Sequence, residues 1–134
     1  MIGMWADNAQ TYLLVLTVVT FFAFTLLLFL KPLLWAKLLL WHVPQEPRDT
    51  HLALYFGRCL GSFAVVTNVF FLQAALKGVG VVLMLQFFTL FCVLMVIVHI
   101  WGAIEKTQPI TETLEIGFWA LLVFLNLAFM PVAG

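Results

Sequence analysis

The charged residues of this chain are confined to a few positions, and the apolar stretches between them are long enough to cross a lipid bilayer. The clearest stretch is 11–30, which contains no charged residue. A hydrocarbon core of about 30 Å requires about 20 residues of α-helix. Comparable, predominantly apolar stretches follow at 52–76, 80–103 and 110–130. The sequence therefore predicts four transmembrane helices.

The composition agrees with a membrane location. Hydrophobic residues make up 65% of the chain and charged residues only 9%, whereas a soluble domain is roughly half apolar and a quarter charged. The formal net charge is zero and no basic run is present, so we expect no nucleic-acid partner. These properties predict an all-α integral membrane protein, with residues 1–134 forming one transmembrane domain and the lipid bilayer as its main partner.

The segments between the stretches are short. Lys31 and Pro32 end the first stretch, because proline cannot continue a helix. The segment 33–43 is apolar but too short to span a bilayer, and it carries Lys37 and two tryptophans. This pattern is typical of a helix that lies at the membrane interface. Short connections between four spans predict an up-down-up-down bundle.

The cations are distributed unevenly between the two ends of such a bundle. Lys31, Lys37, Arg48 and Lys106 belong to the connections after the first and third spans, whereas the connection after the second span carries only Lys77. Cytoplasmic loops of membrane proteins are enriched in lysine and arginine. We therefore expect loops 1–2 and 3–4 to be cytoplasmic, and both termini to be outside or lumenal.

Four ionisable side chains interrupt the apolar stretches at similar depth near the expected cytoplasmic face. They are Arg58 in the second span, His99 in the third, and Glu112 and Glu115 at the start of the fourth. A guanidinium that faces lipid costs a few kcal/mol or more, so Arg58 should face protein, water or headgroups. We expect these side chains to line one cavity, in which Arg58 pairs with Glu115 and His99 donates or accepts a hydrogen bond.

Helical periodicity indicates which residues share a face with these groups. In the fourth span the face contains Glu112, Glu115, Trp119, Leu122 and Asn126. In the third span it contains Phe88, Cys92, Met95 and His99. In the second span it contains Arg58, Gly61, Ser62 and Val65, and Gly57 with Gly61 forms a G-x-x-x-G pair of the kind that permits close helix packing.

The cluster has two interpretations. It either neutralises buried charge and fixes the helix register, or it forms a site open to the cytoplasmic leaflet. In the second interpretation His99 and Glu115 are the catalytic residues, because an imidazole and a desolvated carboxyl can exchange a proton. The candidate ligand-binding residues are Arg58, Tyr55, Glu112, Trp119 and Asn126. No H-x-x-x-H or H-E-x-x-H spacing is present, so we expect no metal and no cofactor.

Two segments carry a resemblance to known families. The segments Thr-His-Leu-Ala-Leu-Tyr-Phe-Gly-Arg at 50–58 and His-Ile-Trp-Gly-Ala-Ile-Glu at 99–105 resemble the small four-helix membrane families of the DoxX-like group. They also loosely resemble the ergosterol-biosynthesis scaffold family, which has a His-Leu run at the start of its second helix. The resemblance implies a four-helix membrane fold.

Three functions follow as hypotheses. The first is a structural or scaffolding subunit, which associates with itself or with a larger membrane assembly. The second is a membrane enzyme with isomerase-like proton transfer, or a binding protein, for a lipophilic sterol, terpenoid or lipid. The third is a small transporter; this hypothesis is placed last because the stretch 11–30 lacks the ionisable residue that four-helix multidrug transporters carry in their first span.

Overall fold

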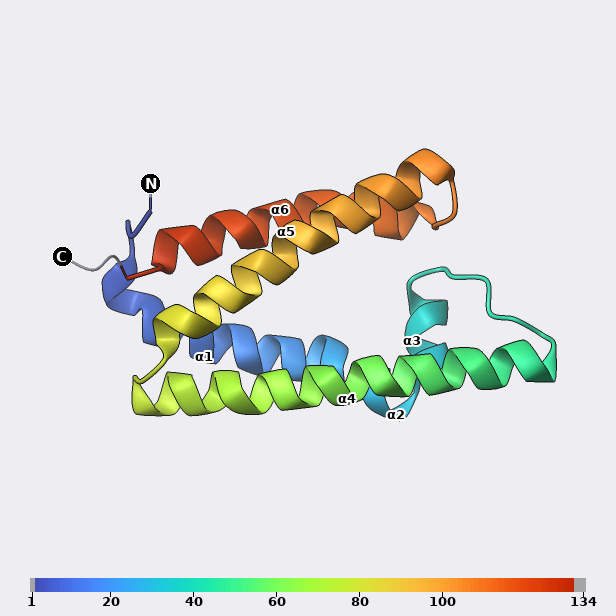
Figure 1. Cartoon of the computed structure of the whole chain (residues 1–134), viewed down its shortest axis with the longest axis horizontal. Helices are drawn as coiled ribbons and strands as arrows, with labels where there is room; N and C mark the ends of the chain where they lie inside the picture. Colours follow the sequence, from blue (N-terminus) through green and yellow to red (C-terminus); the bar gives the residue numbers. More distant parts are fainter. Residues whose placement is uncertain (1, 132–134) are drawn as a thin grey trace.

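The computed structural model describes residues 2–131, and all regular secondary structure among them is helical (Figure 1). A short 3-10 turn at Ala6–Asn8 leads into α1, Ala9–Thr20. The same span continues through the π-helical segment η2, Phe21–Thr25, into α2, Leu26–Leu30. The remaining helices are α3 (Pro32–Leu38), α4 (Pro47–Lys77), α5 (Val81–Glu105) and α6 (Ile110–Phe129).

Four of the continuous helical segments are long and apolar enough to cross a membrane. They are Ala6–Leu30, Pro47–Lys77, Val81–Glu105 and Ile110–Phe129. The chain is thus a multi-pass helical membrane protein, as the four apolar stretches predict. The second helix begins five residues earlier than the predicted 52–76 because Pro47 occupies its first turn, where the missing N–H group of proline is not needed.

The helix after the first span is shorter than predicted. Lys31 leaves the helical conformation, with φ −139° and ψ 63°, and Pro32 begins α3. The sequence predicts a helix over 33–43, but α3 ends at Leu38, and Leu40 has a positive φ of 63°. The chain then remains irregular up to Pro47, in a segment whose two prolines cannot donate backbone hydrogen bonds.

The spans pack as two pairs (Figure 1). Helix α4 lies along α1 and α2, and α5 lies along α6. The pairs meet at the end of the molecule that holds the α4–α5 turn, where Gly78 and Gly80 have φ of 69° and 80°. The start of α1 and the end of α6 lie at this end as well, and the pairs diverge toward the opposite end.

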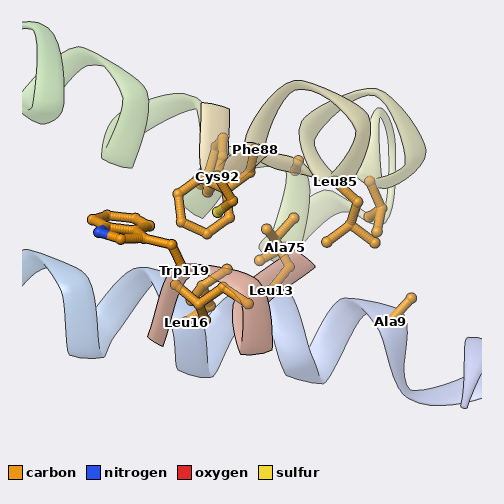
Figure 2. Packing of buried hydrophobic residues seen from close by; sticks show 12 residues of the cluster. Ala9, Leu13, Leu16, Ala75, Leu85, Phe88, Cys92 and Trp119 are labelled. Carbon is orange, nitrogen blue, oxygen red and sulfur yellow. The ribbon is translucent and has the colours of Figure 1, made fainter. Parts of the chain in front are cut away.

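The hydrophobic core lies where the two pairs meet. Figure 2 shows Leu13 and Leu16 of α1 in one cluster with Cys92 of α5 and Trp119 of α6. Asn126 of α6 is fully buried beside this core, accepts a hydrogen bond from the Tyr12 hydroxyl at 2.7 Å, and contacts Cys92 Sγ through its amide nitrogen. This cluster joins all four spans at one end.

Two contacts hold α4 against the first span. A Cβ atom at Gly61 would lie 2.5 Å from Cα of Phe29, so only glycine allows this approach. Asn68 lies about two turns further along α4, and its amide donates to Thr25 Oγ1 at 2.8 Å and accepts from Thr20 Oγ1 at 3.2 Å. The close packing predicted from the two glycines is confirmed, and Asn68 bonds to both ends of the π-helical segment.

Candidate functional site

His99 is the centre of the candidate site. It lies on the buried face of α5, and only 3% of its surface is exposed. Its Nδ1 atom is 2.7 Å from the carbonyl oxygen of Met95, one turn earlier. A carbonyl oxygen can only accept a hydrogen bond, so Nδ1 must carry the proton. The Nε2 atom is therefore the group that faces α6.

Two carboxylates of α6 face Nε2. Its distance is 3.0 Å to Glu112 Oε2 and 3.6 Å to Glu115 Oε2. The two glutamates lie three residues apart, so they project from the same side of the helix. Both belong to the first turns of α6, where the helix dipole favours negative charge. Glu112 is 8% exposed, and Glu115 is half-buried.

Two indole groups orient these carboxylates. Trp41, which follows α3, donates its Nε1–H to Glu112 Oε1 at 2.7 Å. Trp119 donates its Nε1–H to Glu115 Oε2 at 3.2 Å, across one turn of α6. Thr111 also bonds to the carbonyl oxygen of Leu39, so the irregular segment after α3 is held against the start of α6. Each carboxylate thus has one bond that restricts its rotation and a second contact with His99.

Gln108, in the α5–α6 connection, fixes the position of the cluster through two hydrogen bonds. The side-chain amide of Gln108 donates to the carbonyl oxygen of His99 at 2.9 Å and to Thr113 Oγ1 at 3.1 Å. These two bonds tie the end of α5 to the first turn of α6. The relative position of His99 and the two glutamates therefore depends on the loop as well as on helix packing.

An open cleft of about 410 Å³ leads to the cluster. His99, Glu112, Glu105 and Gln108 supply polar groups, and the remaining wall is mainly apolar and aromatic. The other lining residues are Trp41, Met95, Val98, Trp101, Gly102 and Thr107. A cleft of this size and lining is suited to a small molecule that has an apolar body and one polar group.

The charge of the cluster is unbalanced. In the described part of the chain, the only ion pairs within 4.0 Å are those of His99 with Glu112 and Glu115. If both carboxylates are ionised, even a protonated His99 leaves one negative charge uncompensated. The site can therefore share a proton between Nε2 and Glu112, or it can accept a cation.

Arg58 does not belong to this cluster. Its side chain is exposed, and the expected pair with Glu115 is not formed. The rotation of α4 explains the difference, because Gly61 faces the first span, Gly57 faces Pro32 at the start of α3, and Arg58 lies off that contact face. At 1.5 Å per residue, Arg58 also lies about 29 Å from Lys77, so the two cations fit the two interfaces of a core about 30 Å thick.

Two further predicted ligand residues lie elsewhere. Tyr55 is 64% exposed, three residues before Arg58 on α4. Asn126 is fully buried, but it lies about 21 Å from Glu112 along α6 at 1.5 Å per residue. Of the candidate residues, the structure brings together His99, Glu112, Glu115 and Trp119.

Sequence reasoning missed Trp41, the backbone of Met95 and Gln108. Trp41 has the appearance of an interface anchor, and its partner Glu112 is 71 residues away in the sequence. Nothing local indicates that pairing. The Met95 contact follows directly from helical geometry, because a histidine four residues later can reach its carbonyl oxygen.

The fold and the cluster together define a class: a multi-pass helical membrane protein with a buried histidine–carboxylate group at one end of its spans. No family model, no curated protein and no solved structure matches the chain.

Proposed function

We propose that this protein binds a lipophilic molecule with a positively charged or hydrogen-bond-donating group, and that the His99–Glu112–Glu115 cluster receives that group. One observation carries the proposal. Glu112 and His99 line an open cleft, and Glu115 lies directly behind them on α6. Each carboxylate accepts an indole N–H, and among the described residues His99 is their only cationic partner within 4.0 Å. A ligand that supplies positive charge or a donor would complete the cluster.

The lining of the cleft favours an apolar ligand body. Trp41 and Trp101 present aromatic surface, which attracts cations as well as apolar groups. At 1.5 Å per residue, His99 lies about 27 Å from Val81 along α5, close to the limit of a core about 30 Å thick. A molecule dissolved in the bilayer would therefore reach the cleft with its polar end near the membrane surface.

The membrane topology is part of the proposal. The four spans run up-down-up-down, α3 lies at the interface, and loops 1–2 and 3–4 are cytoplasmic. The distribution of Lys31, Lys37, Arg48 and Lys106 against Lys77 supports this orientation. The start of α1 and the end of α6 lie at the same end of the molecule, as an even number of spans requires (Figure 1). In this orientation the cleft opens toward the cytoplasmic leaflet.

Proton transfer is the reaction that this site would offer to a bound molecule. The Met95 carbonyl fixes a proton on Nδ1 of His99, so Nε2, which lies 3.0 Å from Glu112 Oε2, is the ring nitrogen that could exchange a proton. Transfer of a proton from Nε2 to one carbon of a double bond would leave a carbocation on the other carbon. Loss of a proton from a neighbouring carbon to the Glu112 carboxylate would then form the double bond one position along, and return of that proton to Nε2 would complete the isomerisation. Glu115, 3.6 Å from the same nitrogen, would act as the alternative acceptor.

A structural subunit is the second candidate function. Among the described residues, no buried side-chain nitrogen or oxygen lacks a hydrogen-bond partner. The bonds from Tyr12 to Asn126 and from Asn68 to Thr25 join different spans. A protein whose polar groups serve only to fix its helices would also have hydrogen-bond partners for all of its buried polar atoms.

The binding protein and the structural subunit predict different effects of a substitution at Glu112: loss of a bound molecule in the first case and loss of stability in the second. We would purify the parent, Glu112→Gln and the exposed control Arg58→Gln in a mild detergent, extract the co-purifying lipophilic molecules, and quantify them by mass spectrometry. We expect the parent and Arg58→Gln to retain the same molecule. Glu112→Gln should retain at least about tenfold less, which corresponds to about 1.4 kcal/mol.

The melting temperature of Glu112→Gln shows whether the substitution removes a binding group or destabilises the fold. If Glu112→Gln melts near the parent and has lost the lipophilic molecule, the cluster is a binding site. If it melts well below the parent and retains the same molecules in the same amounts, the cluster is structural and the proposal is wrong.

A further inference from the structure

We infer that His99, Glu112 and Glu115 form a binding site for one divalent transition-metal ion, for which Zn²⁺ is the best fit. Nε2 of His99 and one oxygen of each carboxylate all lie within 4.8 Å of one another. The three residues come from two helices that pack along each other, and two of the three are buried. This inference goes beyond the proposed function, because metal binding requires no lipophilic molecule.

The spacing of the three atoms suits a metal. Zinc lies about 2.0–2.2 Å from imidazole nitrogen and carboxylate oxygen, so neighbouring ligand atoms in a tetrahedral site are separated by about 3.3–3.6 Å. In the structure, Nε2 is 3.0 Å from Glu112 Oε2 and 3.6 Å from Glu115 Oε2. The third separation, between the two carboxylate oxygens, is at most 4.8 Å, so the glutamates would have to move together to close around an ion.

The ligands are also oriented as metal ligands require. A histidine that binds metal usually donates its other ring N–H to a carbonyl or carboxylate, which fixes the tautomer and directs the free nitrogen. The bond from His99 Nδ1 to the Met95 carbonyl does this. Trp41 holds Glu112 through Oε1, which leaves Oε2 facing His99. Trp119 bonds to Oε2 of Glu115, the oxygen that faces His99, and keeps that carboxylate beside the imidazole. The open cleft leaves room for water at the remaining coordination positions.

Charge and donor type select the ion. A divalent cation with two carboxylates and a neutral imidazole gives a site with no net charge, whereas a monovalent cation leaves one negative charge. A mixed nitrogen and oxygen donor set suits zinc and related transition metals, while calcium and magnesium prefer sites made of oxygen alone. Among the common divalent ions, zinc stands near the top of the affinity order for such donors.

Zinc loading of the purified protein tests the site. The full chain, with an affinity tag that lacks histidine, would be treated with a chelator, incubated with Zn²⁺, separated from free metal by gel filtration, and analysed for zinc per chain. We expect close to one zinc in the parent. His99→Gln and Glu112→Gln should bind at least about tenfold more weakly, whereas the exposed controls His42→Gln and His51→Gln should bind as the parent does.

A measurement on the parent alone covers the case in which a buried variant does not fold. X-ray absorption at the zinc edge should show one imidazole nitrogen, with the remaining ligands oxygen, at about 2.0–2.1 Å. The inference is overturned by a spectrum with two or more imidazoles, by equal zinc in parent and His99→Gln, or by no retained zinc. Adding a chelator to the lipophile-retention experiment removes metal from that measurement, so failure of this inference and failure of the proposed function are then seen separately.

Discussion

Trp41 and Trp101 line the same cleft, but only Trp41 donates a hydrogen bond to the cluster. Trp41→Phe removes the N–H that holds Glu112, and hydrogen bonds to charged groups contribute about 1.5–3 kcal/mol. We expect this variant to retain about tenfold less of the co-purifying lipophilic molecule, as measured by mass spectrometry. Trp101→Phe, which leaves that bond in place, is the matched control.

The alternative outcome for this pair is also informative. Equal loss in Trp41→Phe and Trp101→Phe would mean that the aromatic surface of the cleft, and not the orientation of Glu112, determines binding. If both variants retain the lipophilic molecule in full, the molecule does not bind in this cleft.

The residues of the cluster were only partly predictable. Periodicity correctly placed Phe88, Cys92 and His99 on one buried face of α5, because that helix is in contact along a single side. On α4 the same reasoning fails for Arg58. The rotation of that helix is set by the backbone approach of Gly61 to Phe29, a contact between segments far apart in the sequence.

At the scale of elements, the approach of α4 to the first span depends on one missing side chain. Gly61→Ala would place a Cβ atom 2.5 Å from Cα and 2.7 Å from N of Phe29, so the helices must separate. Overpacking of this kind costs about 1–3 kcal/mol. We expect a clear drop in the melting temperature of the detergent-solubilised protein, measured by tryptophan fluorescence during heating.

Gly117 supplies the control for this change. A Cβ atom there meets nothing within 4 Å, so Gly117→Ala should melt at or slightly above the temperature of the parent, because alanine favours the helix. If both alanine variants melt together, the contact between Gly61 and Phe29 does not exist in the membrane protein.

The helical spans could be predicted because bilayer thickness fixes their length and hydrophobicity marks their position. Local irregularities could not be predicted in the same way. The π-helical segment Phe21–Thr25 has an ordinary apolar sequence, and its neighbour Asn68 is more than forty residues away. Helix α3 ends at Leu38 although the apolar pattern continues to Val43. The end could not be predicted, because hydrophobicity gives no information about the positive φ that Leu40 adopts.

At the scale of the whole molecule, the proposed orientation predicts which loops a membrane-impermeant thiol reagent can reach. We would remove both native cysteines by alanine substitution and then introduce Glu46→Cys, Thr107→Cys or Val79→Cys, all at exposed positions. With the protein in the plasma membrane of intact cells, only the Val79→Cys protein should be labelled. Labelling of the first two and protection of the third would reverse the orientation, and the cleft would then open away from the cytoplasm.

Both the proposed binding site and the proposed metal site depend on the contact between α5 and α6 at His99. A crystal structure grown from a lipid phase would test it most directly. We expect Nε2 of His99 within hydrogen-bond distance of the Glu112 carboxylate, with the Trp41 indole on the other carboxylate oxygen. A structure in which Glu112 points to lipid or water, while His99 is paired elsewhere, would contradict both the binding site and the metal site.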